Sequence, residues 1–175
     1  EKGMYLIDQH AAKERINYEI CLEKLTNLDN KNIKLLIPIT LEYSTNEYIV
    51  LKENLEFLRN MNFEIDEFGI NSIIVKAHPT WIPKGNEVNA IKKVIELVIY
   101  KEKDFNIKTF NDHLAATMAC KMSIKANEAI TLDEMKYLIE DLRKCKNPFN
   151  CPHGRPTTIF YSTYDLEKLF KRSGF

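Results

Sequence analysis

The sequence is short of the residues that build several common kinds of site. It has five glycines in 175 residues and no G-x-x-x-x-G-K pattern, which excludes a glycine-rich phosphate loop. No nucleophile elbow occurs, so a Ser-His-Asp hydrolase has no support. No apolar run approaches the ~20 residues that a membrane-spanning helix needs. No stretch rich in glycine, serine and proline indicates a linker.

A surplus of charge is also missing. Lys+Arg and Asp+Glu number 25 each, so the formal net charge is zero. A domain that binds nucleic acid tightly by itself usually has a basic surplus. We therefore expect only weak DNA binding by this chain alone, although a local basic stripe remains compatible with neutrality.

Cysteines are few, and nothing in the sequence indicates secretion. The four are Cys21, Cys120, Cys145 and Cys151, and reduced thiols are the expectation. Cys145 and Cys151 bracket the segment KNPFN and would form a small disulfide loop only in an oxidising compartment.

The pattern of apolar residues predicts an α+β fold with two lobes. Hydrophobic residues make up 45% of the chain, enough for a core. Pro38 indicates an edge or a bulge in its strand, residues 69–71 a hairpin turn, and Thr131 with Glu134 a capping box.

The abrupt start EKGMYLI suggests a piece of a longer protein. Strands are expected at 4–7, 33–44, 63–69, 71–79 and 156–164, and helices at 8–28, 44–62, 83–103, 109–130, 132–145 and 165–172.

The first predicted helix carries polar groups on or near its apolar side. His10 and Glu14 are four residues apart and so share one face, which suits either two metal ligands or a histidine–glutamate hydrogen bond. Asp8 comes before the regular turns and is either the N-cap or a ligand. Glu19 points away from His10, and we expect an orienting or salt-bridging role for it.

A second candidate site lies in the segment NPFNCPHGRPTT. Cys151 and His153, followed by Gly154, can point the same way from a turn, and a thiolate with an imidazole is a ligand set that zinc favours. A structural turn with a buried cysteine and a histidine bonded to main chain fits equally well. Arg155 beside the pair suits phosphate binding.

The helix at 109–130 holds a third cysteine. Cys120 is either a core residue or a ligand. His113 and His78 are not taken as ligands, because lone histidines more often make structural contacts. Lys121 and Lys125, one turn apart, could follow a phosphate backbone or simply face solvent.

Four motifs in one order resemble a known family. Residues 8–19 match the pattern D-Q-H-A-x2-E-x4-E, residues 119–121 read ACK, residues 151–156 read CPHGRP and residues 170–172 read FKR. This set resembles the C-terminal endonuclease domain of the MutL family of DNA mismatch-repair proteins, in its nicking form. Any single motif is weak, but four in order across the chain are a strong signal.

The resemblance implies an architecture and partners. It implies a dimerisation lobe from residues 1–45 and 120–175 that carries the metal site and forms a homodimer, and an inserted regulatory lobe from 46–119. Apolar strand residues that need a covered face agree with a homodimer: Leu36, Ile39, Ile159 and Tyr161. It also implies an ATP-binding N-terminal ATPase region in the same protein, the mismatch-recognition protein MutS as a partner, and a bacterial, cytoplasmic, nucleoid-associated location.

A contact with the replication sliding clamp is implied as well. The family uses a Q-x-x-L/I-x-P segment, and here residues 33–38 read IKLLIP, with Ile33 in place of the glutamine. The same residues also fit a strand that enters a bulge. The residues that match the clamp motif are Leu35, Leu36, Ile37 and Pro38.

The resemblance also assigns the site. It implies metal-assisted phosphodiester hydrolysis that nicks one DNA strand. Because six candidate ligands exceed one tetrahedral zinc, two ions sharing a carboxylate are expected, with Zn2+ in a structural or regulatory role and Mn2+ or Mg2+ for catalysis. Two alternatives stay open, a structural zinc module for dimerisation and a clamp-binding adaptor without metal. The implied metal ligands are Asp8, His10, Glu14, Cys120, Cys151 and His153. The implied catalytic residues are Asp8, His10, Glu14 and Arg155. The residues implied to support the site or contact the DNA phosphate are Gln9, Glu19, Lys121 and Arg172.

Overall fold

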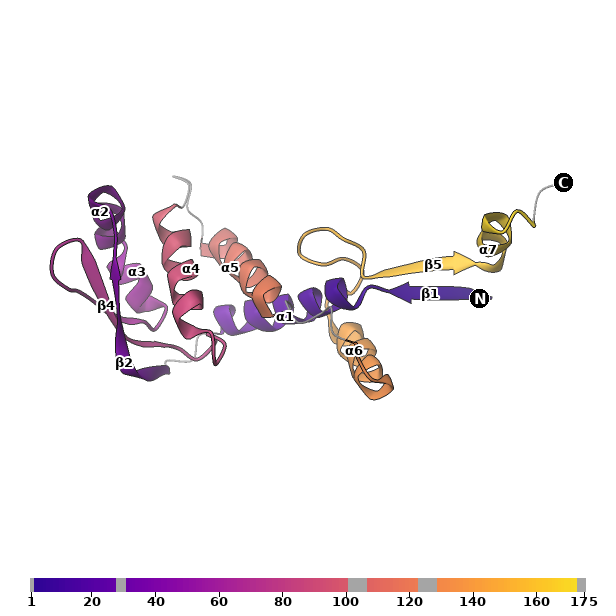
Figure 1. Ribbon diagram of the computed structural model, residues 1–175, viewed down its shortest axis with the longest axis horizontal. Helices are drawn as coiled ribbons and strands as arrows, with labels where there is room; N and C mark the ends of the chain where they lie inside the picture. The colour runs from indigo at the N-terminus through magenta and orange to yellow at the C-terminus, as the bar shows by residue number, and fades with distance from the viewer. Residues whose placement is uncertain (1, 28–30, 101–106, 123–128, 173–175) are drawn as a thin grey trace. The chain divides into compact units, whose positions relative to one another are not determined.

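The computed structural model describes residues 2–27, 31–100, 107–122 and 129–172, without the side chain of Lys121 (Figure 1). Helices and strands are mixed, which confirms the predicted α+β class. No helix in these ranges is long and apolar enough to cross a membrane. The strands are β1 Gly3–Ile7, β2 Asn32–Glu42, β3 Glu64–Glu67, β4 Ser72–Pro79 and β5 Thr158–Ser162. The helices are α1 Gln9–Thr26, α2 Thr45–Glu53, α3 Leu55–Asn60, α4 Glu87–Ile99, α5 Ile107–Met122, α6 Leu132–Lys144 and α7 Thr163–Leu169.

The chain divides into two compact units. One consists of Glu1–Ile20 and Ala115–Phe175, and the other of Cys21–Leu114. The strand β2, which the sequence places with the chain ends, pairs with β4 and so belongs to the second unit. The lobes predicted at 1–45 with 120–175 and at 46–119 stay a prediction.

The second unit contains an antiparallel sheet of order β2-β4-β3. The turn between β3 and β4 forms as predicted, and Gly69 (φ 71°) and Asn71 (φ 52°) take the left-handed conformation that tight turns need. The pairing of β2 with β4 shifts register between Lys34 and Ile39, which confirms the bulge indicated by Pro38. The core of this unit includes Leu51, Leu58, Ile73, Val75, Ile91, Val94, Ile95 and Val98, all fully buried.

One predicted helix is two in the structure. The segment 44–62 breaks at Asn54, which ends α2 with φ −111°. The side-chain amide of Asn54 donates to the carbonyl of Val50 (2.7 Å), and its backbone N–H donates to Leu51 (2.9 Å). Asparagine competes for backbone partners in this way, so the helical pattern of apolar residues continues across a real break.

The unit made from the chain ends places the candidate site. β1 pairs antiparallel with β5, from Gly3 opposite Ser162 to Ile7 opposite Thr158 (Figure 1). β1 runs directly into α1, and the segment before β5 returns to the start of that helix, where the N–H of Asp8 donates to the carbonyl of Thr157 (3.0 Å). This bond extends the pairing of β1 with β5 to the start of α1.

Helix α6 packs against α1 in the same unit. Ala12 on α1 forms an apolar cluster with Leu138 and Leu142 on α6. The capping box of Thr131 and Glu134 forms as predicted at the start of α6. Because α6 ends at Lys144, its packing delivers the following segment, which carries Cys151 and His153, to the side of α1.

Candidate metal centre

The N-terminus of α1 is capped by Asp8. Its Oδ1 accepts hydrogen bonds from the backbone N–H groups of His10 (2.9 Å) and Ala11 (3.1 Å). Such bonds satisfy amide groups that the first turn of a helix leaves without a partner. Of the two predicted roles of Asp8, the cap is therefore formed, and the cap does not use the second oxygen, Oδ2.

Glu14 lies one turn after His10 and is buried. Its residue surface is 2% exposed, and its Oε1 lies 3.3 Å from Nε2 of His10. A buried carboxylate is costly without partners. The partners of Glu14 come from α1 itself and from the segment before β5.

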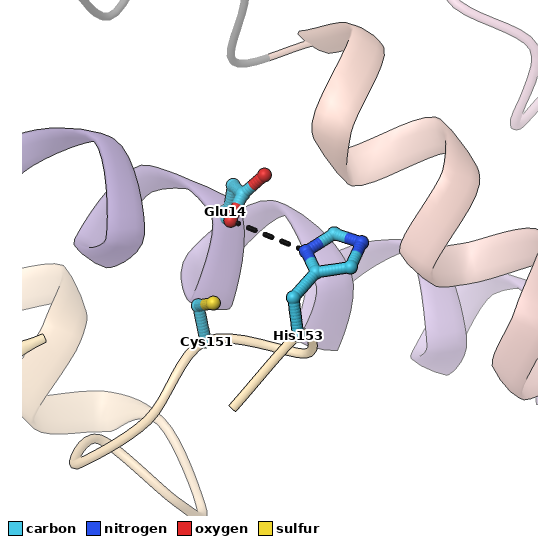
Figure 2. A group of neighbouring side chains, drawn as sticks. All are labelled: Glu14, Cys151 and His153. Carbon is cyan, nitrogen blue, oxygen red and sulfur yellow. Dashed lines mark hydrogen bonds and ion pairs between the residues drawn. The ribbon is translucent and has the colours of Figure 1, made fainter. Parts of the chain in front are cut away.

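A tight turn brings Cys151 and His153 to Glu14. The N–H of Cys151 donates to the carbonyl of Arg155 (2.8 Å), and the N–H of Gly154 donates to the carbonyl of Cys151 (3.0 Å). Gly154 has φ 83°, a conformation that suits glycine and closes the turn. Figure 2 shows the result: the side chains of Cys151 and His153 converge on the carboxylate of Glu14.

The three side chains form a compact group of possible ligand atoms. One atom each from Glu14, Cys151 and His153 lie within 4.8 Å of one another, and Nδ1 of His153 is 3.4 Å from Oε2 of Glu14. Cys151 is buried and His153 exposed, so the group has one open side. It is the candidate that the geometry singles out in the described part of the chain.

Electrostatics favour an ionised carboxylate in this group. Burial opposes ionisation of Glu14, but hydrogen bonds from the Cys151 thiol and His153, with the charges of His153 and His10, lower the pKa of Glu14 below its ordinary value. Partial desolvation and the neighbouring Glu14 carboxylate raise the pKa of the Cys120 thiol. The charge of Glu14 therefore reaches Cys120, which is not part of the three-residue group.

The donor set fits a divalent metal ion. Sulfur, imidazole nitrogen and carboxylate oxygen together are ligands that zinc accepts, and His10 and Cys120 border the group with two more donors. The ionised Glu14 matches what an ion requires, because ligands bind in their deprotonated forms. The site is therefore chemically able to bind zinc. Of the sequence-predicted ligands, Glu14, Cys151 and His153 form the group, and His10 contacts Glu14.

The remaining predicted residues lie at several places. Glu19 pairs with Arg15 (3.7 Å), in agreement with a salt-bridging role. Arg155 is exposed, and its positive charge partly offsets the rise in the pKa of the Cys120 thiol. Arg172 follows α7, and its N–H donates to the carbonyl of Glu167 (2.8 Å).

The other predicted contacts are described only in part. Gln9 begins α1. Lys125, and the side chain of Lys121, lie outside what the structure describes. The predicted clamp segment lies on β2, where Leu36 is 98% and Ile37 78% exposed, while Leu35 is half-buried and Pro38 exposed.

The cysteines agree with the expectation of reduced thiols. Cys21, Cys120, Cys145 and Cys151 are thiols in the structure, and none of them is part of a disulfide. Cys145 and Cys151 thus form no disulfide loop, and the Cys151 sulfur remains available as a donor.

Comparison with known proteins points to one family. A family model described as the MutL C-terminal dimerisation domain matches residues 1–130. Proteins named DNA mismatch repair protein MutL are similar over 172 residues, 98% of this chain: 45% identical in Bacillus pumilus, 46% in Shouchella clausii and 48% in Anoxybacillus flavithermus. The chain spans 27%, 26% and 28% of the length of these relatives. The chain belongs to the MutL C-terminal dimerisation domain family.

Proposed function

We propose that this chain is the metal-dependent nicking endonuclease domain of a MutL mismatch-repair protein. The observation that carries the proposal is the convergence of Glu14, Cys151 and His153 within 4.8 Å, from segments far apart in the sequence. Each of the three belongs to a motif of the nicking form of the family. A structural turn alone would not require a buried carboxylate opposite a cysteine and a histidine.

The chain's own residues would hold and orient the ion and the DNA phosphate. Glu14, Cys151 and His153 would bind the ion, with His10, Cys120 and Oδ2 of Asp8 as further donors. A bound divalent ion would activate water and offset negative charge at the phosphate. Softer donors suit Zn2+, whereas Mn2+ or Mg2+ would be held more weakly at the oxygen-rich side and support turnover. The exposed guanidinium of Arg155, and Lys121 and Arg172, would contact phosphate.

A homodimer and a set of further partners belong to the same proposal. All five residues of β1 are exposed, including Met4, Tyr5 and Leu6, and a second copy of the chain would cover them. The exposed Leu36 and Ile37 would bind the sliding clamp. The remaining partners would be DNA, MutS and the ATPase region of the same protein, in the bacterial cytoplasm at the nucleoid.

A second candidate is a zinc-stabilised dimerisation and clamp-binding module without catalysis. It is favoured by one observation: Asp8 already serves as the cap of α1, so the helix needs its carboxylate for a structural reason. A structural zinc site would use Glu14, Cys151 and His153 and have no need of Asp8 as a ligand.

The substitution Asp8→Asn separates the two candidates, because asparagine caps a helix about as well as aspartate but is a poor metal ligand. Nicking of supercoiled plasmid by the full-length protein with Mn2+ should fall by more than about 100-fold, since even outer partners of ligands are worth about 10–100-fold. Zinc content and the circular dichroism spectrum should stay the same. The matched control is Asp133→Asn, an exposed carboxylate in the first turn of α6, which should nick like the parent.

The outcomes decide between the candidates. Nicking lost in Asp8→Asn with zinc retained supports the endonuclease. A parent that binds zinc but does not nick supports the structural module. A parent that binds no metal by elemental analysis contradicts both.

A further inference from the structure

The segment 146–150 joins α6 to the turn that carries Cys151 and His153, and two residues of α1 hold it. We propose that Arg15 and Glu19 are positioning residues, which fix this segment against α1 and so preset the spacing of Cys151 and His153 from Glu14. The inference rests on the proposed function, because that spacing matters only if the three side chains bind an ion.

Glu19 anchors the start of the segment. Its Oε2 accepts a hydrogen bond from the N–H of Lys146 (2.7 Å), and its Oε1 accepts one from the N–H of Asn147 (3.1 Å). Each carboxylate oxygen thus takes one backbone N–H, which fixes two consecutive peptide groups directly after the C-cap of α6. A surface salt bridge between long side chains would leave the backbone free, and this arrangement does not.

Arg15 anchors the end of the segment. It is 8% exposed, and its Nε donates to the backbone carbonyl of Asn150. That carbonyl belongs to the peptide group joining Asn150 to Cys151, so the bond sets the direction in which the chain enters the ligand turn. The guanidinium is itself held in place, 3.7 Å from Oε1 of Glu19 and 5.1 Å from the centre of the Tyr18 ring.

The middle of the segment is held by Thr157, the residue directly before β5. The hydroxyl of Thr157 donates to the carbonyl of Pro148, and its N–H donates to Phe149 (2.9 Å). Thr157 is fully buried. The segment is therefore held by α1 at both of its ends and by Thr157 in the middle.

The position of these contacts gives them a consequence for ion binding. Arg15 follows Glu14 directly on α1, so one helix turn presents both the buried ligand and the group that places its partners. If the segment were flexible, part of the binding free energy of the ion would be spent on ordering it, and the affinity would be lower. A segment already held in place avoids this cost. Partners that orient ligands are worth about 10–100-fold in metal affinity.

The test compares Arg15→Gln, Arg15→Lys and Glu19→Gln with the parent protein. We expect the Kd for Zn2+, from competition with a chelator, to rise about 10–100-fold in Arg15→Gln. Lysine keeps the charge but lacks the planar guanidinium group, so the Kd of Arg15→Lys for Zn2+ should lie between those of the parent and Arg15→Gln. Co2+ titrations should show the sulfur-to-metal absorption band in every variant, at higher Co2+ concentration in the weaker ones. Lys136→Gln, which removes an exposed salt bridge on α6, is the matched control and should bind like the parent.

Hydrogen exchange of the metal-free protein is a second measurement, and it does not depend on nicking activity. In Arg15→Gln and Glu19→Gln, the amides of residues 146, 147 and 149–151 should exchange faster than in the parent, while a β4 peptide stays unchanged. Zn2+ affinity within about twofold of the parent in both folded variants would overturn the inference and leave the proposed function standing. If the parent binds no ion, both fail. If Arg15→Gln does not fold, as judged by circular dichroism, Glu19→Gln decides.

Discussion

At the scale of single residues, the candidate site depends most on Glu14. Its carboxylate is buried and its pKa is lowered by its hydrogen-bond partners and by nearby histidine charge, although burial opposes this. A carboxyl group with a pKa lowered in the folded state adds stability above its unfolded pKa. That contribution is lost as the pH falls through the folded pKa.

We therefore expect Glu14→Gln, in protein freed of metal by a chelator, to lower the free energy of unfolding at about pH 6 by about 1.5–3 kcal/mol, the usual contribution of a hydrogen bond to a charged group. The difference from the parent should shrink as the pH falls below the ordinary glutamate pKa of 4.5. Urea unfolding at several pH values measures it. The exposed Glu140→Gln on α6 should show neither effect, and a pH-independent difference in Glu14→Gln would contradict the lowered pKa.

Residue spacing predicted part of this site. The i, i+4 spacing of His10 and Glu14 gives the contact at 3.3 Å, and the alternatives of cap and ligand for Asp8 included the role that the structure has. Arg15 was beyond prediction, because its partner is a backbone carbonyl 135 residues away. Carbonyl groups occur at every position and give no signal in the sequence. The burial of an arginine beside a buried glutamate is a property of the fold alone.

At the scale of elements, β1 and β5 form a two-stranded sheet whose apolar side chains are exposed. Leu6 is 48% and Ile159 44% exposed, and the two are paired across the strands. A two-stranded sheet is marginal by itself in water, so a second copy of the chain is the expected cover. We expect the parent to be a dimer at micromolar concentration and Leu6→Asp to shift it to a mass near 20.5 kDa, as measured by light scattering.

The control for this prediction is Ile70→Asp. Ile70 is 90% exposed in the turn between β3 and β4, so the same apolar-to-acidic change there should leave the mass unchanged. A parent of single-chain mass, or equal dissociation in both variants, would contradict a dimer through β1 and β5.

Elements with a local signal were predictable, and those decided by competing bonds were not. Thr131 and Glu134 form their capping box, and the turn at 69–71 forms, because both depend on residues close in sequence. The sequence does not predict the break at Asn54, because the helical spacing of apolar residues continues across it. The break depends on a hydrogen bond of one side-chain amide to the backbone. The pairing of β2 with β4 likewise depends on tertiary contacts that the order of elements does not specify.

At the scale of the whole molecule, the charge balance limits what this chain can do alone. A formal net charge of zero gives little counterion release on DNA, so affinity should be weak and sensitive to salt. The chain also spans only about a quarter of the relatives it matches, 26% to 28% of their length. We expect the other parts of such a protein, or the sliding clamp, to bring DNA to the site.

The resulting prediction is that this chain alone nicks plasmid slowly with Mn2+ at moderate salt, and that the full-length protein with the clamp nicks at least about tenfold faster at matched concentration. Ile37→Ser, which removes an exposed apolar side chain from β2, should abolish the increase caused by the clamp and leave nicking without the clamp unchanged. Ile49→Ser is the control, because Ile49 is 53% exposed on α2, away from the clamp motif. Equal rates for the chain alone, the full-length protein and the protein with clamp would show that delivery does not limit nicking. The neutral charge would then have no bearing on how the site reaches DNA.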